Sequence, residues 1–143
     1  MATPGKTMAI PGSGLATAEK TVAKPGSGLA TPEDLLAQIV ECAMEKKAKD
    51  VLELDMRGVL GYTDWFVICT GNTERQTKAI HDGIVQGCKR ELQMTPRRVE
   101  GLGTGDWVLM DYMDVVVHVF TPATREYYRL ERLWGEVPAR TVV

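Results

Sequence analysis

Cysteine is scarce in this chain of 143 residues, and its three copies form no recognisable pair. Cys42, Cys69 and Cys88 are odd in number and widely spaced, and none belongs to a C-x-x-C motif. This pattern favours neither a disulfide framework nor a zinc site, and it fits a reducing compartment. The two histidines, His81 and His118, have no third ligand at metal spacing, so we expect neither a catalytic metal nor another cofactor.

Long hydrophobic runs are also missing. Hydrophobic residues make up 44% of the chain and charged residues 25%, as in globular proteins. No apolar run approaches the roughly 18 residues that span a bilayer. The N-terminal segment lacks the apolar core of a secretory signal and the arginines of a transit peptide. We therefore expect a cytoplasmic protein that does not enter a membrane.

An excess of basic charge is absent as well, because the formal net charge is −2. Three lysines against one glutamate give residues 1–32 a net charge of +2, which leaves −4 on the remainder. Binding to phosphates needs clustered Lys and Arg side chains. We therefore expect little direct contact with nucleic acid.

Glycine and proline are concentrated near the N-terminus. Residues 9–17 read AIPGSGLAT and residues 23–31 read AKPGSGLAT, a repeat at a spacing of 14. So little apolar surface cannot offset chain entropy, and we expect residues 1–31 to be a flexible, disordered arm. One folded domain is expected over residues 32–137, followed by a tail over residues 138–143.

Two helices are indicated in the first two thirds of the domain. Residues 31–34 read TPED, which supplies an N-cap residue, a proline for the first turn and carboxylates at the positive end of the helix dipole. The apolar residues that follow at helical spacing are Leu35, Leu36, Ile39, Val40, Ala43 and Met44. A longer helix is indicated by apolar residues at every fourth position: Ile80, Ile84, Cys88 and Leu92. Gly83 and Gly87 in its middle predict a close approach to a neighbouring element.

The strands are indicated by two different patterns. Residues 51–56 alternate as in a half-buried strand, whereas residues 65–69 form a continuous apolar run that predicts a central strand buried on both faces. A weaker strand is expected over residues 97–100. A strand, turn, strand, helix unit then follows over residues 106–134. This order predicts a mixed α/β sheet of about five strands covered by helices.

The unit over residues 106–134 is the most informative part of the chain. It concentrates aromatic and β-branched side chains and offers almost nothing for covalent chemistry, which is typical of a docking surface. Alternation along its first strand places Trp107, Leu109 and Asp111 on one face. Val108 and Met110 fall on the other face.

Several motifs in fixed order carry a resemblance to a known family. They are DWFVICTGN at residues 64–72, RQ at 75–76, AI at 79–80, EG at 100–101, DWVLMD at 106–111, VHVF at 117–120, and residues 125–134. Together they resemble the ribosomal silencing factor family, also called Iojap, from residue 33 to residue 136. The chain departs from the pattern at Met113, where the turn commonly has glycine. A left-handed backbone there would strain methionine.

The resemblance implies a function as well as a fold. The fold would be similar to that of nucleotidyltransferases, without that activity, so we do not expect an enzyme. The function would be that of a translational repressor. It would bind the large ribosomal subunit at ribosomal protein number fourteen and sterically block association with the small subunit when nutrients are limiting. Homodimers are common in the family, so a homodimer is a further expectation.

The residues that we expect to contact the partner are Trp107, Leu109, Asp111, Asp114 and Tyr128. Tryptophan is enriched among binding hot spots because it buries a large area with little loss of rotamer entropy. Two alternatives remain open: Trp107 as a core residue under a helix, and the two aspartates as turn residues that bind backbone amides. Tyr127 and Tyr128 are neighbours on a helix, so only one can point fully into the core. His118 is expected to be a satisfied residue of the sheet.

A nucleotidyltransferase-like enzyme or a nucleotide-binding protein is the alternative function. Such an enzyme needs a Gly-Ser turn and two aspartates one residue apart that bind magnesium together. Here Asp111 and Asp114 are three positions apart, and the candidate turn at residues 70–72 reads TGN. The glycine-rich residues 101–105 lack a P-loop lysine and precede no helix, so they are a weak candidate for phosphate binding.

Overall fold

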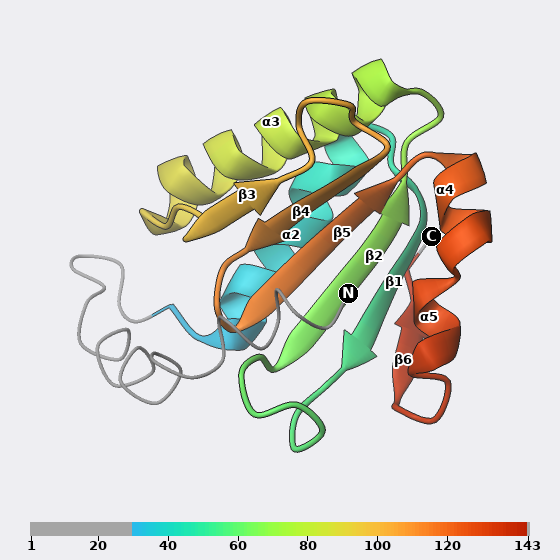
Figure 1. The fold of residues 1–143 in the computed structure, drawn as a ribbon. Helices are drawn as coiled ribbons and strands as arrows, with labels where there is room; N and C mark the ends of the chain where they lie inside the picture. The colour runs from blue at the N-terminus through green and yellow to red at the C-terminus, as the bar shows by residue number, and fades with distance from the viewer. Residues whose placement is uncertain (1–29, 143) are drawn as a thin grey trace.

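The computed structural model describes residues 30–142, which form one sheet with helices on both of its faces (Figure 1). The expected flexible arm and its repeat fall on residues 1–29 and so lie outside the described residues. The strands are β1 (Lys49–Asp55), β2 (Trp65–Thr70), β3 (Arg98–Glu100), β4 (Trp107–Asp111), β5 (Val115–Phe120) and β6 (Ala139–Thr141). The helices are α2 (Pro32–Glu45), α3 (Glu74–Leu92), α4 (Pro122–Tyr128) and α5 (Leu130–Leu133).

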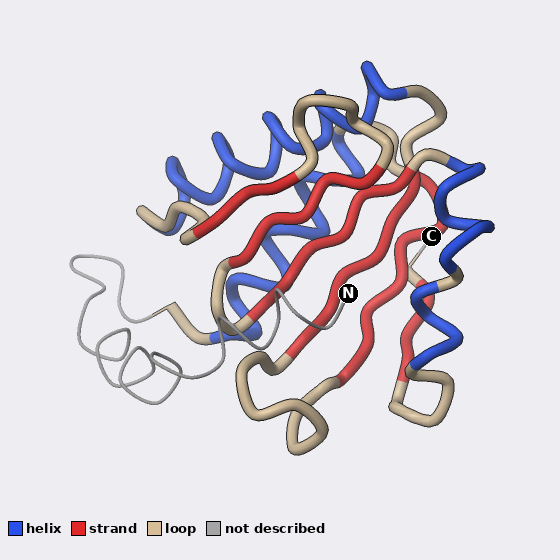
Figure 2. Tube along the Cα trace, in the orientation of Figure 1, coloured by secondary structure: helices blue, strands red, loops and turns tan. Residues whose placement is uncertain are grey.

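The sheet is mixed, in the order β3-β4-β5-β2-β1-β6 (Figure 2). β2 and β5 pair in parallel, and every other neighbouring pair is antiparallel. The predicted fold class is therefore confirmed, with six strands instead of about five. The additional strand is β6, which comes from the segment expected to be a tail. Its three residues are all exposed, so they give no alternating pattern that a sequence could reveal.

Side chains of the central strands alternate between two hydrophobic cores. Val67 of β2 and Val117 of β5 face α2 and α3, whereas Phe66 and Val116 face the side of α5. All four are buried. The prediction of a central strand buried on both faces is confirmed, and Figure 1 places α2 and α3 on one side of the sheet and α4 and α5 on the other.

The start of α2 follows from its first residues. Thr31 is the N-cap, and it forms a capping box in which its hydroxyl accepts from the Asp34 amide while the Asp34 carboxylate accepts from the Thr31 amide, each at 3.0 Å. Five of the six predicted apolar positions are buried. Met44 is the exception, at 41% exposure.

The two central glycines of α3 mark its contact with α2, as predicted. A Cβ atom at Gly83 would lie 2.9 Å from the side-chain carbons of Lys46, and a Cβ atom at Gly87 would clash with the sulfur of Cys42. α3 begins with Thr73 as N-cap, whose hydroxyl accepts from the Gln76 amide at 3.1 Å. Glycine therefore permits the close approach of the two helices.

The three cysteines are free and buried. Burial raises the pKa of Cys69 and the pKa of Cys88 to about 12, so both thiols stay protonated near neutral pH and are poor nucleophiles. Within residues 30–142 no group of His, Cys, Asp and Glu side chains could hold a metal ion. No helix in the same range is long and apolar enough to cross a membrane.

Candidate functional site

An aromatic layer covers the sheet face that is turned toward α4 and α5. Trp107, at the start of β4, is half-buried, and its ring centroid lies 4.9 Å from that of Phe120 and 4.9 Å from that of Tyr128. Its indole N–H donates to Nδ1 of His118 at 3.1 Å. Trp107 thus packs on the sheet and contacts α4 at its side. It is partly a core residue, as one interpretation predicted, and partly a surface residue, as the other predicted.

His118 is the polar centre of this layer. It is 4% exposed and lies between Phe66 and Phe120, with ring centroids 4.9 Å and 6.3 Å away. Burial lowers its pKa to about 3, so the ring is neutral at physiological pH and its Nδ1 accepts the Trp107 hydrogen bond. Its Nε2 has no partner within the described residues. His118 is therefore satisfied at one nitrogen only, which corrects in part the expectation of a fully satisfied residue.

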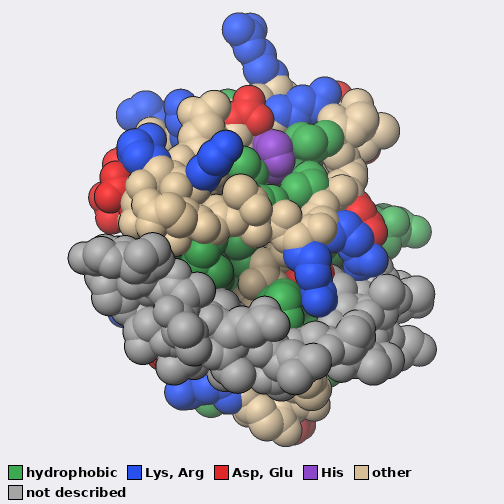
Figure 3. Space-filling model, turned by 90° about the vertical axis from the view of Figure 1, so that its left-hand side faces the viewer, with side chains coloured by type: hydrophobic (Ala, Val, Ile, Leu, Met, Phe, Trp, Pro, Cys, Tyr) green, Lys and Arg blue, Asp and Glu red, His purple; other side chains and the backbone are tan. Residues whose placement is uncertain are grey.

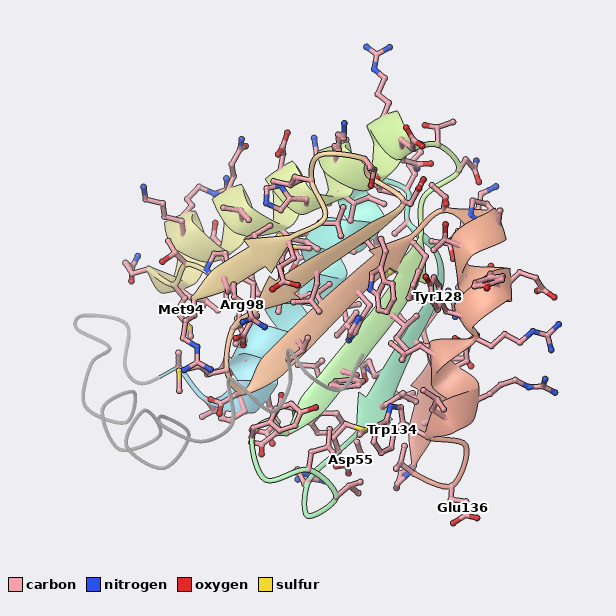
Figure 4. The ribbon with its side chains drawn as sticks, viewed as in Figure 1. Asp55, Met94, Arg98, Tyr128, Trp134 and Glu136 are labelled. Carbon is pink, nitrogen blue, oxygen red and sulfur yellow. The ribbon has the colours of Figure 1, made fainter. Side chains whose placement is uncertain are left out.

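The two tyrosines of α4 lie at the outer edge of the aromatic layer. Tyr127 is 79% exposed and Tyr128 is 50% exposed, and their rings meet edge to face at 4.9 Å. Neither enters the core, because α4 contributes no buried residue. Figure 4 shows Tyr128 at the side of α4 that is turned toward the sheet. We call the connected rings of Trp107, Tyr127 and Tyr128 the aromatic surface.

Asp111 and Asp114 build the turn between β4 and β5. Asp111 is fully buried, and its carboxylate accepts from the Met113 amide at 2.8 Å and from Nε of Arg97 at 3.4 Å. Asp114 is 7% exposed, and its carbonyl oxygen accepts from the amides of Asp64 and Trp65. In this structure both aspartates act as turn residues, and the Asp111 carboxylate could reach a partner only if the turn opened.

The alternation predicted for β4 is confirmed. Leu109 belongs to the same core as Trp107 and is 8% exposed, while Val108 and Met110 face α2 and α3 and are fully buried. Of the five expected contact residues, the structure therefore brings Trp107 and Tyr128 together at the surface. It places Leu109 beneath that surface, and the two aspartates at the other end of β4, in the turn to β5.

Arg125 opens the last motif that carries the family resemblance, but it was not among the expected contact residues. Its Nη1 donates to the carbonyl oxygen of Asp50 at 2.7 Å and to the hydroxyl of Thr70 at 2.8 Å, and its Nε donates to the Glu131 carboxylate at 3.3 Å. These bonds tie α4 to the ends of β1 and β2. Because the partners are 75 and 55 residues away, no local pattern reveals them.

The glycine-rich loop does not form an open phosphate cradle. Gly101 and Gly105 have positive φ angles of 91° and 84°, and the carbonyl oxygen of Gly105 accepts from the Thr77 hydroxyl of α3 at 2.6 Å. The loop is thus held against the first turns of α3. This arrangement agrees with the weak signal for phosphate binding in the sequence.

Comparison with known families gives a match over the whole described part of the chain. The model of the family described as "Ribosomal silencing factor during starvation" matches residues 29–142. A ribosomal silencing factor of Halalkalibacterium halodurans is 42% identical over 106 residues, which cover 73% of this chain and 89% of that protein. The counterpart of Bacillus subtilis is 44% identical over 95 residues, which cover 66% of this chain and 79% of the relative.

More distant relatives include proteins of organelles, and solved structures share the fold. The chloroplastic protein Iojap of Zea mays is 30% identical over 102 residues, covering 68% of this chain and 42% of that protein. A crystal structure of a Chromobacterium violaceum protein has a TM-score of 0.71 at 33% identity, covering 79% of this chain and 93% of the other. A crystal structure of a Bacillus halodurans protein has a TM-score of 0.68 at 38% identity, covering 77% of this chain and 99% of the other.

Proposed function

The chain belongs to the ribosomal silencing factor family, and from this membership we propose that it represses translation by binding the large ribosomal subunit. The contact is made with ribosomal protein number fourteen, on the face where the small subunit docks. The bound protein occupies that face and sterically prevents the two subunits from joining when nutrients are limiting. It acts in the cytoplasm and catalyses no reaction.

The aromatic surface is the observation that carries this proposal. Tyr127 and Tyr128 are large rings with high exposure, and the half-buried Trp107 supports them from the sheet. Aromatic residues dominate binding energy at protein interfaces, because they bury much area at low entropic cost. In this arrangement Leu109 packs in the same core as Trp107, while Asp111 and Asp114 hold the turn at the far end of β4.

The charge distribution favours a protein partner over ribosomal RNA. The chain carries a net charge of −2, and on the side of the molecule drawn in Figure 3, which is turned away from α4 and α5, the Lys and Arg side chains are scattered between other residues. A protein that makes an extended contact with RNA would instead carry an excess of basic charge.

Sedimentation with isolated ribosomal subunits tests the proposed mechanism. The purified protein should sediment with large subunits and not with small subunits. When it is added before the small subunits, it should lower the yield of joined ribosomes. Equal retention on joined ribosomes would contradict a steric block. Analytical ultracentrifugation of the free protein tests the homodimer that the family suggests.

Replacement of single rings tests the surface itself. Tyr128→Ala should weaken binding to large subunits by about 2 kcal/mol, roughly thirtyfold in Kd, since it removes a hot-spot side chain. Met44→Ala on α2 is the matched control, because Met44 is also exposed and apolar but lies on the opposite side of the sheet. Trp107→Ala should weaken binding similarly, with circular dichroism to separate lost contact from lost fold. Equal binding of Tyr128→Ala and wild type would exclude α4 from the interface.

A further inference from the structure

A groove of about 710 Å³ lies between α4 and α5 on one side and the ends of β1 and β2 on the other. It is separate from the aromatic surface, since it contains none of Trp107, Tyr127 and Tyr128. A volume of this size is typical of sites for small molecules.

The topology of the sheet puts this groove at a special place. β2 and β5 are parallel neighbours, and after β2 the chain turns to α3 on one face, whereas after β5 it turns to α4 on the other. In α/β sheets, a crevice that opens where the connections leave in opposite directions is a common ligand site. Thr70 and Asn72 line the groove from the first connection, and Pro122 and Arg125 line it from the second.

The walls of the groove are held in place by hydrogen bonds. Arg125 has a side chain only 14% exposed, and it joins the Asp50 carbonyl oxygen, the Thr70 hydroxyl and the Glu131 carboxylate. The turn at Asn72 is fixed in the same way, because its amide donates to Oε1 of Gln76 at 2.6 Å while Nε2 of Gln76 donates to the carbonyl oxygen of Lys46 at 3.1 Å. The groove therefore exists before any ligand enters.

The groove offers cationic side chains that are not used elsewhere. Lys49 and Arg132 line it, and neither has an ion-pair partner within the described residues. Arg129 also lines it and pairs with Glu126. Two unpaired cations at one groove favour an anionic group, of which phosphate is the form that Lys and Arg bind most often.

The groove also offers an acceptor. Glu131 binds Arg125 through Oε2, but its Oε1 is buried and has no hydrogen-bond partner in the described part of the chain. The Glu131 side chain lines the groove and is 30% exposed, so a turn of its carboxylate would bring this oxygen to a ligand that donates a hydrogen bond. A hydroxyl group supplies such a donor.

We propose that this groove binds a phosphorylated sugar or a nucleotide, with the phosphate at Lys49 and Arg132 and a sugar hydroxyl at Oε1 of Glu131. The combination requires a ligand that is anionic at one end and carries a hydroxyl donor at the other. The proposal concerns binding only, and it does not depend on the ribosomal function.

Titration followed by NMR tests the site, with ribose 5-phosphate, AMP, adenosine and inorganic phosphate as probes for the full chain. Ribose 5-phosphate and AMP should shift the backbone amides of residues 49–52 and of α4. Lys49→Gln and Arg132→Gln should each weaken binding of both probes by about tenfold, the loss of one charged contact. Lys89→Gln and Arg90→Gln, in the last turn of α3, are matched controls and should leave binding unchanged.

Glu131→Gln tests the acceptor, and its expected result is that ribose 5-phosphate loses its advantage over inorganic phosphate. Three outcomes would overturn the proposal. The first is the absence of amide shifts with every phosphorylated probe at millimolar concentration. The second is that the wild type binds inorganic phosphate and ribose 5-phosphate equally. The third is that Lys49→Gln and Arg132→Gln leave the affinity unchanged. Adenosine that binds as tightly as AMP would exclude the phosphate contact.

Discussion

Met113 holds a backbone conformation that suits glycine better than methionine. Its φ angle is 76°, in the turn that Asp111 fixes through the Met113 amide. The left-handed conformation destabilises a residue that has a Cβ atom by about 1–2 kcal/mol. Glycine would remove this strain, but it loses more conformational entropy on folding, so the net gain in stability is smaller. Methionine at this position therefore carries a strain that the turn tolerates.

Met113→Gly should stabilise the protein by up to about 1 kcal/mol. The measurement is chemical denaturation, compared with Met113→Ala, which shortens the side chain without relieving the backbone. An unchanged or lower free energy of unfolding for Met113→Gly, with Met113→Ala behaving identically, would show that the turn stores no strain.

His118 should make the stability of the protein depend on pH. Its pKa is about 3 in the folded chain against 6.5 for a free histidine. Between these two values the unfolded chain binds a proton that the folded chain does not, so stability is fully present above pH 6.5 and is lost as the pH falls toward 3. The loss approaches about 1.4 kcal/mol per pH unit within this window.

Denaturation at several pH values checks this dependence. His118→Gln, which keeps a hydrogen-bond acceptor near Trp107, should flatten the dependence below pH 6.5. His81→Gln is the control, since His81 lies on α3 beside Asp82 and outside this layer. The same slope in wild type and His118→Gln would assign the acid sensitivity to other groups.

At the scale of elements, α4 is positioned mainly by Arg125, beside the contact of Tyr128 with Trp107. The helix buries no residue, and Arg125 joins it to β1 and β2. Arg125→Gln should therefore loosen α4 and α5 while the sheet persists, because hydrogen bonds to a charged group contribute about 1.5–3 kcal/mol. Hydrogen exchange should rise in α4 and α5 only. Arg132→Gln is the control, and uniform exchange across the whole chain would instead mean global destabilisation.

Some elements could be predicted from the sequence and others could not. The capped start of α2, the buried run of β2 and the alternation of β4 were predictable, because each depends on a local pattern. β6 was not, since all three of its residues are exposed, and neither was the position of α4, which long-range bonds of Arg125 determine. The contact of Trp107 with Tyr128 depends on that position, so the aromatic surface could be suspected from composition but not assembled.

At the scale of the whole molecule, the acidic character of the chain determines how its binding responds to salt. Proteins that make 6–10 phosphate contacts lose about 10³- to 10⁵-fold in affinity between about 50 and 200 mM salt. An aromatic contact with a ribosomal protein should lose less than about tenfold over that range. Cosedimentation with large subunits at increasing salt measures this dependence. A steep decrease in affinity would show that the main contact is with RNA.

The parallel pairing of β2 with β5 has a further consequence for folding. Val67 pairs with Val117, so the middle of the sheet joins segments fifty residues apart. Such non-local contacts slow folding, because the chain loses the entropy of closing a long loop before the strand pairing stabilises it. A fragment that stops before β5 would leave β2 with β1 as its sole neighbour and both faces apolar. The domain should therefore fold as one cooperative unit, and a chain cut between its two halves should aggregate instead of retaining a stable half.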